Sequence, residues 1–465
     1  MSEAAVRSGG ATAINPATGQ PGKTYPWLSE AERHAVLDQA VAGFRQWRDF
    51  PVEKRADVLR GVAAYFREHV ERFARTMTEE MGKPIKMSRA EVEKCAKLCE
   101  WSADHGPAFV ADELTEVEGD KAYVSYLPIG VIYLIMPWNF PLWQAMRAAV
   151  PIMLAGNGAA LKHAPNCVAS AFNVQEAFEA AGAPKGAFTV LNIHQDDSPA
   201  TIADDRIAAV TLTGSVRAGS AVAAEAGRNI KKSVLELGGS DPFIVLKDAD
   251  IDPAVTAAVE SRFQNTGQVC IAAKRTIVEA PIVEEFTRLF VERVKALKIG
   301  DPLREDTYIG PMARRDLRDE LDRQVKRSIE DGATLVLGGE PTGPDEATFY
   351  APTILTGVRP GMTSFREEIF GPVASIIVAR DADDALEMAN DSAFGLSAAI
   401  WTKDVELAKA IARKLEVGGV FINGFAASDP RTPIGGTKKS GYGRELFHFG
   451  FREFTNAQVV WQDRK

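Results

Sequence analysis

The sequence predicts an α/β protein with two domains, each built on a mostly parallel, doubly wound sheet. The first reason is length, because 465 residues exceed what one hydrophobic core usually organises and suggest about two or three domains. The second is pattern: from residue 130 onward short apolar runs alternate with helical stretches, as in parallel strands joined by helices. The composition, 46% hydrophobic and 25% charged residues, is typical of a globular enzyme.

The first hundred residues are predicted to be mainly helical after a short extended lead-in. Ser29 followed by Glu32 is a capping-box pattern, which predicts a helix from there through Phe44. Cys95 and Cys99 lie four residues apart and so share a helix face. Because two thiols are too few for a zinc site, we interpret both as core residues and predict no metal site.

Two series of alternating elements follow. The first series has predicted strands at 123–127, 131–135, 158–162 and 207–212, and helices at 166–181 and 218–227. The second has strands at 243–246, 275–278 and 373–378, helices at 282–297 and 315–331, and a loop at 341–350. The series meet near residue 239, and pockets tend to form at such junctions.

Charge and hydropathy exclude several classes of function. A net charge of -9 and a pI near 5.4 argue against nucleic-acid binding, which needs clustered cations. No run approaches the ~18 apolar residues of a membrane helix, and the first residues lack the apolar core of a secretory signal. Four cysteines are not a disulfide framework. We therefore expect a cytoplasmic protein without a membrane partner.

One cysteine has a setting that suits covalent catalysis. Cys270 ends the small, amide-rich segment FQNTGQVC at 263–270, and Glu236 opens an ELGG segment upstream. A deprotonated thiol is a strong nucleophile, and a separate carboxylate can activate water to break the thioester that forms. Taken alone, the loop fits a buried packing cysteine better, since free cysteines are commonly buried.

Two other segments lie where open α/β sheets bind ligands, after predicted strands. The TGS segment at 213–215 leads from a strand into a helix, whose free N–H groups can bind an anion; an ordinary turn remains the alternative. The PWNFP segment at 137–141 offers the Asn139 amide as an oxyanion donor. A rigid turn packed by aromatic residues is an equally good interpretation of that segment.

Five segments together resemble the aldehyde dehydrogenase superfamily in order and spacing, over essentially the whole chain. They are PWNFP at 137–141, TGS at 213–215, ELGG at 236–239, GQVC at 267–270 and EEIFGP at 367–372. The resemblance implies a cofactor domain (1–109 and 130–236, with a return at 439–452), a catalytic domain (237–438) and a small β oligomerisation arm (110–129 and 453–465).

The resemblance also implies a mechanism. Cys270 would attack the aldehyde, Asn139 and the Cys270 N–H would hold the oxyanion, and Glu236 would activate the hydrolytic water. The expected cofactor is NAD, with NADP possible. Pro165 stands where many NAD-dependent members carry a glutamate, and no phosphate-binding serine or threonine replaces that glutamate. The implied cofactor-binding residues are Trp138, Lys162, Pro165, Gly214, Ser215, Leu237, Glu368 and Phe370.

The expected substrate is succinate semialdehyde or a similar short ω-carboxy aldehyde. Arg147 follows Pro137 by ten residues and looks like the carboxylate anchor of the bacterial branch that oxidises this compound, because a guanidinium can bind a carboxylate bidentately. Trp143, Gln264 and Ser428 are the other implied substrate-binding residues.

The chain departs from that branch at Gln264, where some members carry a second arginine. A neutral amide makes weaker hydrogen bonds to a carboxylate than a guanidinium does. Arg262, Ser428 or Arg431 are candidates to compensate.

Three alternatives stay open. The chain could be a broad aliphatic or aromatic aldehyde dehydrogenase, a thiol hydrolase, or an inactive binding protein on the same fold. A hydrolase usually needs a Cys-His motif, and none is recognisable. The resemblance further implies a homodimer or homotetramer, in which the arm at 109–128 joins the 454–460 strand of a partner subunit.

Overall fold

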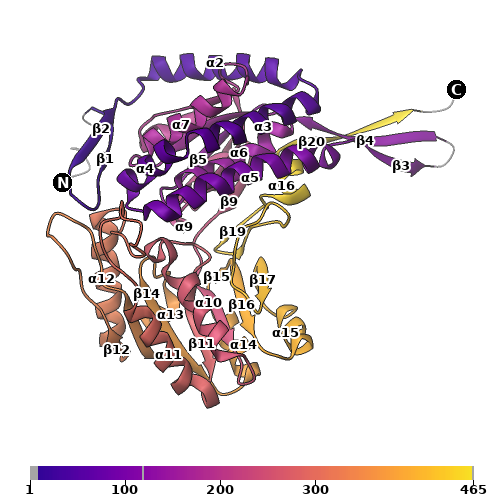
Figure 1. The fold of residues 1–465 in the computed structure, drawn as a ribbon. Helices are drawn as coiled ribbons and strands as arrows, with labels where there is room; N and C mark the ends of the chain where they lie inside the picture. The colour runs from indigo at the N-terminus through magenta and orange to yellow at the C-terminus, as the bar shows by residue number, and fades with distance from the viewer. Residues whose placement is uncertain (1–8, 118–119, 463–465) are drawn as a thin grey trace.

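The computed structural model describes residues 9–117 and 120–462. Two lobes and a projecting arm make up the molecule (Figure 1). The upper lobe holds a six-stranded sheet and the N-terminal helices, and the lower lobe holds a seven-stranded sheet. These two sheets with their helices confirm the predicted α/β class. No described helix is long and apolar enough to cross a membrane.

The sheet of the upper lobe is parallel except at one edge. Its strands, in spatial order, are β19 (Gly441–Tyr442), β9 (Lys232–Glu236), β8 (Ile207–Thr213), β5 (Val131–Met136), β6 (Gly158–His163) and β7 (Phe188–Val190). Only β19 runs antiparallel to its neighbour. The strands predicted at 131–135, 158–162 and 207–212 are confirmed, because their continuous apolar runs suit a sheet buried on both faces.

Helices cover this sheet. They are α2 (Glu30–Arg48), α3 (Val52–Glu68), α4 (Val70–Met81), α5 (Ile85–Phe109), α6 (Pro141–Leu154), α7 (Val168–Ala180), α8 (Ser198–Ala203), α9 (Val216–Arg228) and α16 (Phe447–Glu453). Ser29 and Glu32 form the predicted capping box at the start of α2. The helix ends at Arg48, one turn beyond the predicted Phe44, because Trp47 still faces the core.

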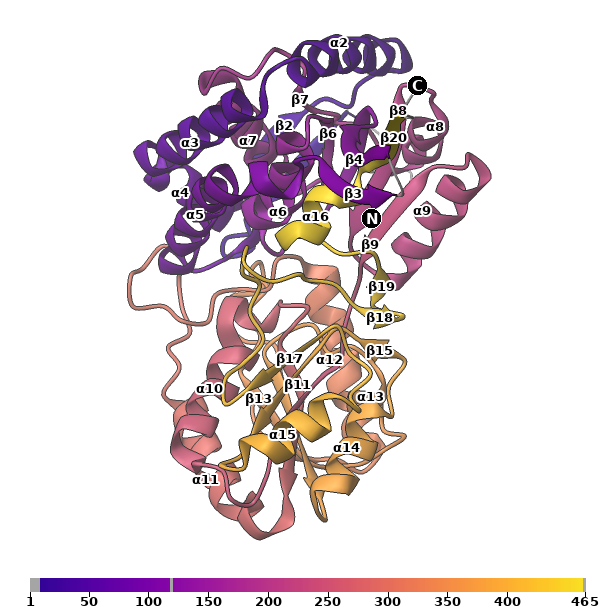
Figure 2. The same cartoon turned by 90° about the vertical axis from the view of Figure 1, so that its right-hand side faces the viewer.

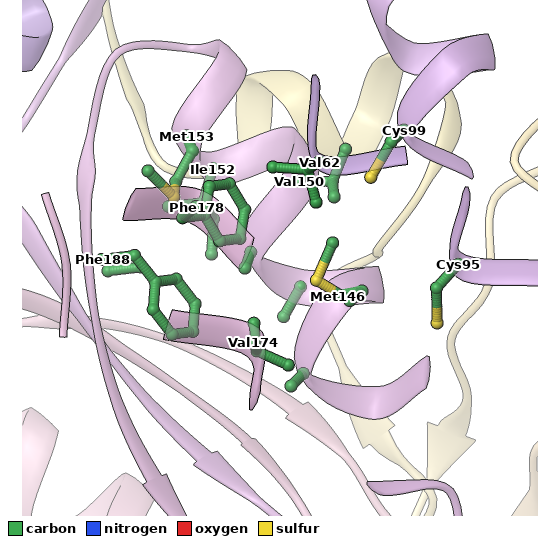
Figure 3. Close-up of a cluster of buried hydrophobic side chains, with 14 of the residues drawn as sticks. Val62, Cys95, Cys99, Met146, Val150, Ile152, Met153, Val174, Phe178 and Phe188 are labelled. Atoms are coloured by element: carbon green, nitrogen blue, oxygen red, sulfur yellow. The ribbon is translucent and has the colours of Figure 1, made fainter. Parts of the chain in front are cut away.

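The core of the upper lobe lies around α6, which is buried along its whole length. Figure 3 shows side chains of this cluster, including Phe178 and Phe188, whose rings stack 4.9 Å apart. Cys95 and Cys99 are fully buried in the same cluster as free thiols. Their prediction as core residues is confirmed.

The sheet of the lower lobe is parallel apart from its first strand. Its strands, in spatial order, are β12 (Thr334–Leu337), β13 (Thr353–Val358), β14 (Val373–Ala379), β11 (Ala273–Glu279), β10 (Asp241–Val245), β16 (Ser397–Trp401) and β17 (Gly419–Ile422). Its helices are α10 (Ile251–Phe263), α11 (Val283–Lys295), α12 (Arg315–Glu330), α13 (Thr363–Arg366), α14 (Ala382–Asn390) and α15 (Val405–Ala412). The strands predicted at 243–246, 275–278 and 373–378 are confirmed.

The chain passes between the two sheets at residues 237–240, since β9 ends at Glu236 and β10 begins at Asp241. It returns through β18 (Thr437–Lys438), which pairs with β15 (Phe394–Gly395) of the lower lobe, and then β19. Figure 2 shows this return next to the junction of the lobes. The exact domain boundaries stay predictions.

The arm consists of β3 (Glu113–Val117), β4 (Asp120–Pro128) and β20 (Thr455–Gln462). The sequence analysis expected the arm at 109–128 to join the C-terminal strand of a partner subunit. This expectation is wrong for β4, whose partner is the C-terminal strand of the same chain. Within one chain, β20 pairs antiparallel with β4, so that Tyr123 faces Val460 and Ser125 faces Gln458. Helix α16 packs against α5 and α6 and brings the chain back beside β4.

One element near the N-terminus lacks a sequence signal. The lead-in at 14–19, which the sequence predicts to be extended, is mostly the turn of a hairpin formed by β1 (Ala11–Ile14) and β2 (Pro21–Tyr25). The strands are short and read ATAI and PGKTY, so neither strand has the apolar periodicity that identifies a strand from sequence.

Candidate active site

A cavity of about 350 Å³ lies between the lobes, next to the carboxyl ends of β5 and β8. Open parallel sheets bind their ligands at this edge. The cavity brings together nine residues that the sequence predicted to act in catalysis or cofactor binding. They are Trp138, Asn139, Gly214, Ser215, Glu236, Leu237, Cys270, Glu368 and Phe370.

Cys270 is presented by a strained segment, which we call the nucleophile loop (residues 264–270). Asn265, Thr266 and Gly267 have φ angles of 51°, 56° and 71°. Three successive residues in the left-handed region are unusual, and a β-branched threonine there is unfavourable. Such strain persists only where the surroundings over-determine the conformation.

Contacts from several elements hold the loop. Thr266 Oγ1 donates to the Gly310 carbonyl at 3.2 Å and accepts from the Gly310 N–H at 3.1 Å. Gly267 passes so close to Gly371 that a Cβ atom would lie 2.2 Å from the Gly371 oxygen. Only glycine fits there, so the path of the chain up to Cys270 is fixed.

Arg262, near the end of α10, also holds the nucleophile loop in place. It is fully buried, and its guanidinium donates to the carbonyls of Val373 at 2.5 Å, Ile369 at 2.8 Å and Gly267 at 3.2 Å. The sequence interpretation of Arg262 as a cation that compensates for Gln264 is therefore wrong. Its hydrogen bonds connect the nucleophile loop to the segment that carries Glu368 and Phe370.

The Cys270 thiol has two cations in its surroundings. Burial raises its pKa to about 11, while the charges of Arg147 and Lys274 act in the opposite direction. The Lys274 side chain is fully buried, and its ammonium donates to the carbonyls of Val269 at 2.9 Å and Cys270 at 2.5 Å. The thiolate, once formed, is therefore stabilised from both lobes.

Asn139 is 4% exposed and held by the nucleophile loop. Its side-chain amide donates to the backbone carbonyl of Gln268 at 3.0 Å, and its backbone carbonyl accepts from the side-chain amide of Asn265 at 2.8 Å. An amide nitrogen carries two N–H donors, so a second donor is left for a ligand. Asn139 and Cys270 line the same cavity, as an oxyanion site requires.

Glu236, at the end of β9, is 3% exposed. Its Oε1 atom is buried and has no hydrogen-bond partner among the described residues. Burial raises the pKa of this carboxyl well above its ordinary value, and Glu445 adds to the rise while Arg147 opposes it. A carboxylate that is poorly solvated and unpaired is a strong proton acceptor, which suits a general base.

Arg147 is the residue that the sequence predicts to anchor the substrate carboxylate. It is 2% exposed and does not line the cavity. Its Nε atom donates to Glu445 Oε2 at 2.5 Å, and its Nη2 atom donates to Thr213 Oγ1 at 3.3 Å. The guanidinium is thus occupied by this chain's own carboxylate, and its field acts on Glu236 and Cys270.

On the cofactor side, Glu368 is fixed against the backbone at the junction of the lobes. Its Oε1 atom accepts from the Gly239 N–H at 3.1 Å and lies 3.4 Å from Lys274 Nζ. A Cβ atom at Gly238 would lie 2.0 Å from Glu368 Oε2. This acceptor-only group faces the cavity, where it can take bonds from the hydroxyls of a diol.

Two aromatic rings close the same side, because Trp138 and Phe370 meet edge to face at 5.7 Å. Ser215 caps α9 by accepting from the Ala218 N–H at 3.3 Å, which leaves the first N–H groups of that helix free to bind an anion. Leu237 packs against Gly219, where any Cβ would lie 2.6 Å from the leucine. The helix therefore approaches the cavity closely.

Lys162 and Pro165 follow the same edge of the sheet but do not line the cavity. Lys162 is the penultimate residue of β6, and burial lowers the pKa of its ammonium to about 8. It has no carboxylate within 4.0 Å in the described part of the chain. Pro165 is exposed. The chain therefore places a cation at the end of β6, and position 165 adds no acidic side chain beside it.

The remaining predicted substrate residues lie outside the cavity as well. Trp143 is buried on α6, and Gln264 is half-buried at the start of the nucleophile loop. Ser428 lines a second, much smaller cavity of about 30 Å³, whose wall includes Ile271, the residue after the nucleophile. Arg431, the other candidate to compensate for Gln264, is exposed and paired with Asp429 at 2.7 Å.

Sequence reasoning missed several lining residues. Gln144 is 2% exposed and its Oε1 atom has no partner in the described chain. Gln144 lies five residues after Asn139, on the helix that the PWNFP segment opens, so this segment could have drawn attention to it. Arg314 and Leu317, from the start of α12, line the cavity too, and no signal in the sequence connects them with it.

No cluster of side chains suited to a metal ion occurs among residues 9–117 and 120–462. The chemistry available is that of a thiol, an unpaired carboxylate and an amide at the ligand-binding edge of a doubly wound sheet, which defines an enzyme of covalent cysteine catalysis next to a nucleotide-type crevice. The profile of the Aldehyde dehydrogenase family matches residues 5–460. The chain belongs to that family.

Known relatives agree in sequence and in fold. The chain is 55% identical over 454 residues to the NAD(P)+ succinate semialdehyde dehydrogenase Sad of Escherichia coli, which covers 98% of each chain. A probable succinate-semialdehyde dehydrogenase (NADP+) of Synechocystis is 46% identical, over 96% of this chain and 98% of the relative. A crystal structure of succinic semialdehyde dehydrogenase from Streptococcus pyogenes with NADP+ superposes with a TM-score of 0.95 at 37% identity, covering 98% and 100% of the two chains.

Proposed function

We propose that this protein oxidises succinate semialdehyde to the carboxylic acid with a nicotinamide dinucleotide as the oxidant. The observation that carries the catalytic part is the meeting of Cys270, Glu236 and Asn139 in one cavity at the edge of the cofactor sheet. The names of the relatives support the choice of aldehyde and of cofactor.

Cys270 acts first. Its thiolate sulfur bonds to the aldehyde carbon, and the former carbonyl oxygen becomes an oxyanion held by the free N–H of Asn139 and the backbone N–H of Cys270. Because these donors are fixed by the nucleophile loop before substrate arrives, they stabilise the oxyanion without reorganisation. Bound in the crevice, a nicotinamide dinucleotide supplies the hydride acceptor. Loss of hydride from the carbon leaves a thioester on Cys270.

Glu236 then completes the reaction. Its unpaired carboxylate takes a proton from water while the water oxygen attacks the thioester carbon. The C–S bond breaks, the carboxylic acid leaves, and the sulfur of Cys270 is free for another turnover. The net change is aldehyde plus water to acid, with one hydride transferred and one proton released.

The cofactor side of the cavity fits a dinucleotide. Glu368 offers acceptors for ribose hydroxyls, the N-terminus of α9 suits a pyrophosphate, and Lys162 provides a cation without a carboxylate partner. Pro165 brings no negative charge that would repel a 2′-phosphate. We infer that both NAD and NADP are accepted.

Steady-state assays test the proposal. We expect the absorbance of reduced nicotinamide to rise when the protein is mixed with succinate semialdehyde and either dinucleotide, and kcat/KM to exceed that for butanal. No reduction with any aldehyde and either cofactor would contradict the dehydrogenase, and equal kcat/KM for the two aldehydes would contradict the substrate.

We also infer that the protein is a homodimer or homotetramer. The arm exposes large apolar side chains: Leu114 is 88%, Val459 64% and Trp461 54% exposed. Val459 and Trp461 lie on one face of the arm's sheet and Leu114 lies on the other. Exposed apolar side chains of this kind usually mark interaction surfaces. Light scattering after size-exclusion chromatography should give a molecular mass of about two or four times 50.4 kDa. Replacement of Val459 and Trp461 by Asp should lower this mass. A monomeric parent protein would refute the inference.

A further inference from the structure

A buried ion pair lies beside the helix that follows Asn139. Lys83, between α4 and α5, contacts Glu91 Oε2 on α5, and the two side chains are 0% and 1% exposed. Neither residue lines the catalytic cavity or belongs to the five segments that resemble the family. Because taking two charges out of water is costly, such a pair is a poor source of stability, but it fixes the geometry of the groups that it bonds.

Glu91 caps α6 with its other oxygen. The Oε1 atom accepts from the backbone N–H groups of Leu142 and Trp143, both at 2.9 Å. These are the first N–H groups of the helix, because α6 begins at Pro141, which has none. Phe140, in the N-cap position, makes no side-chain hydrogen bond to the helix, so Glu91 supplies the cap from α5. Its negative charge also suits the positive end of the helix dipole.

The turn between Asn139 and α6 is held at two further points. The Lys83 ammonium lies 3.7 Å from the centroid of the Phe140 ring, which is a cation–π contact. His163 Nε2 donates to the Pro141 carbonyl at 2.8 Å, because its Nδ1 atom accepts from the next backbone N–H. Burial lowers the pKa of His163 to about 4, so this ring stays neutral. The two residues after Asn139 are thus fixed by side chains of other elements.

The chain around the ion pair also contacts the nucleophile loop. Met87, in the first turn of α5, accepts from the Asn265 N–H through its sulfur at 3.3 Å. A Cβ atom at Gly310 would lie 2.3 Å from the Gly82 oxygen, and Gly310 is hydrogen-bonded to the same loop. This part of the chain therefore touches both structures that hold the Asn139 amide, the start of α6 and the nucleophile loop.

We propose that Glu91, oriented by Lys83, is a positioning residue that fixes the Asn139 amide in the place where it binds the oxyanion. The proposal rests on the proposed oxidation of an aldehyde through Cys270. An oxyanion donor is effective when it is already in place as the charge develops, and a small misplacement of such a group slows the reaction strongly. Glu91 touches no reacting atom, so its effect on the reaction passes through the turn at 139–141.

The test compares Glu91→Ala, Glu91→Asp and a matched control, Glu93→Ala, each made in the parent enzyme and in Asn139→Ala. Glu93 is on the same helix, and its side chain is 40% exposed. Alanine removes the cap from α6, whereas aspartate keeps the charge on a shorter side chain. Single-turnover rates of hydride transfer are measured by stopped-flow absorbance with succinate semialdehyde and with butanal. Alkylation of Cys270 by iodoacetamide is measured separately, because this reaction forms no oxyanion.

We expect Glu91→Ala to lower the rate of hydride transfer by about 10- to 100-fold for both aldehydes, because the Asn139 amide is misplaced but not removed. KM should change by less than about threefold, and the alkylation rate should stay within about twofold of the parent. In Asn139→Ala, the same change should lower the rate by less than about twofold, because the amide that Glu91 positions is gone. Glu91→Asp should have a smaller effect of the same kind, and Glu93→Ala should have none.

Equal losses in the parent enzyme and in Asn139→Ala would overturn the proposal, and so would a fall in alkylation as large as the fall in hydride transfer. Either result would mean that the ion pair supports the fold of the whole site. Failure of the proposed function is distinct, because it would appear in the parent enzyme as no reduction of nicotinamide with either aldehyde. Thermal unfolding identifies a folding defect, and Glu91→Asp is judged by the same comparison if Glu91→Ala does not fold.

Discussion

The nucleophile loop and the segment at 424–433, which we call the rim loop, border the same part of the molecule but are built differently. Most of the nucleophile loop is buried: Asn265 is 2%, Thr266 1% and Gln268 0% exposed. Its left-handed residues are held by hydrogen bonds from several elements. The rim loop is mostly half-buried or exposed. Reacting atoms need fixed geometry, whereas recognition of a tail needs only a few well-placed donors.

This contrast predicts two kinds of mutational effect. Changes near the nucleophile loop should lower kcat for every aldehyde, because they alter groups that act on the reacting carbon. Changes at the rim loop should alter KM for carboxylated aldehydes only. A rim variant that lowered kcat for all substrates would break the distinction.

The largest effect is expected for Cys270→Ser, which replaces the thiol by a much weaker nucleophile with little change of shape. Turnover of both succinate semialdehyde and butanal should fall about 10⁴-fold or more, as for other removed nucleophiles. Mass spectrometry should find no acyl-enzyme. A variant that kept a tenth of the parent activity would show that another group attacks the aldehyde.

Glu236→Gln should have the next largest effect, lowering kcat by about 100- to 1,000-fold through loss of the general base. The acyl-enzyme should accumulate, giving a burst of reduced nicotinamide followed by a slow phase. In the parent, hydrolysis should accelerate as pH rises through the raised pKa of Glu236, because only the deprotonated carboxylate accepts a proton. The variant should lose this pH dependence; an unchanged profile would assign it to another group.

Arg147→Met should lower kcat by about tenfold for both aldehydes, corresponding to a change of about one pKa unit at the groups its charge acts on. The loss leaves Glu445 buried without its ion partner, so the thermal midpoint should fall as well. Stopped-flow measurement of the burst and the steady-state rate would locate the affected step. A loss confined to succinate semialdehyde would instead support the anchor predicted from sequence.

Ser428→Ala should have the smallest effect, a rise of about fivefold in KM for succinate semialdehyde, because one hydrogen bond to the substrate carboxylate is lost at a half-buried position. Butanal kinetics should not change. A double-mutant cycle with Lys94→Met should show coupling, since the two side chains are in contact. Additive effects would mean that the hydrogen bond from Lys94 does not position Ser428.

The sequence predicted the α/β class and the strands around the cavity, because their apolar runs and glycine turns are local signals. It also predicted the nine lining residues through motifs whose spacing is set by strand ends. The pairing of β20 with β4 was not predictable, since alternation shows that a strand can pair but not with which chain.

The substrate side was the least predictable part of the site. Arg147 and Lys94 are both cations on helices that reach this region, and only the tertiary contacts show that Glu445 neutralises one and that Trp143 and Ser428 surround the other. Arg262 illustrates the same limit, because a buried arginine bonded to carbonyls and one that binds a ligand look alike in sequence.

Lys274 gives the two halves of the site a common charge. One fully buried ammonium contacts the backbone of the nucleophile and lies 3.4 Å from the carboxylate that faces the cofactor crevice. Any ligand that draws Glu368 away from Lys274 leaves more of that positive charge to act on the sulfur of Cys270. The thiol of this protein is thereby made sensitive to what occupies the neighbouring crevice, without any movement of the backbone.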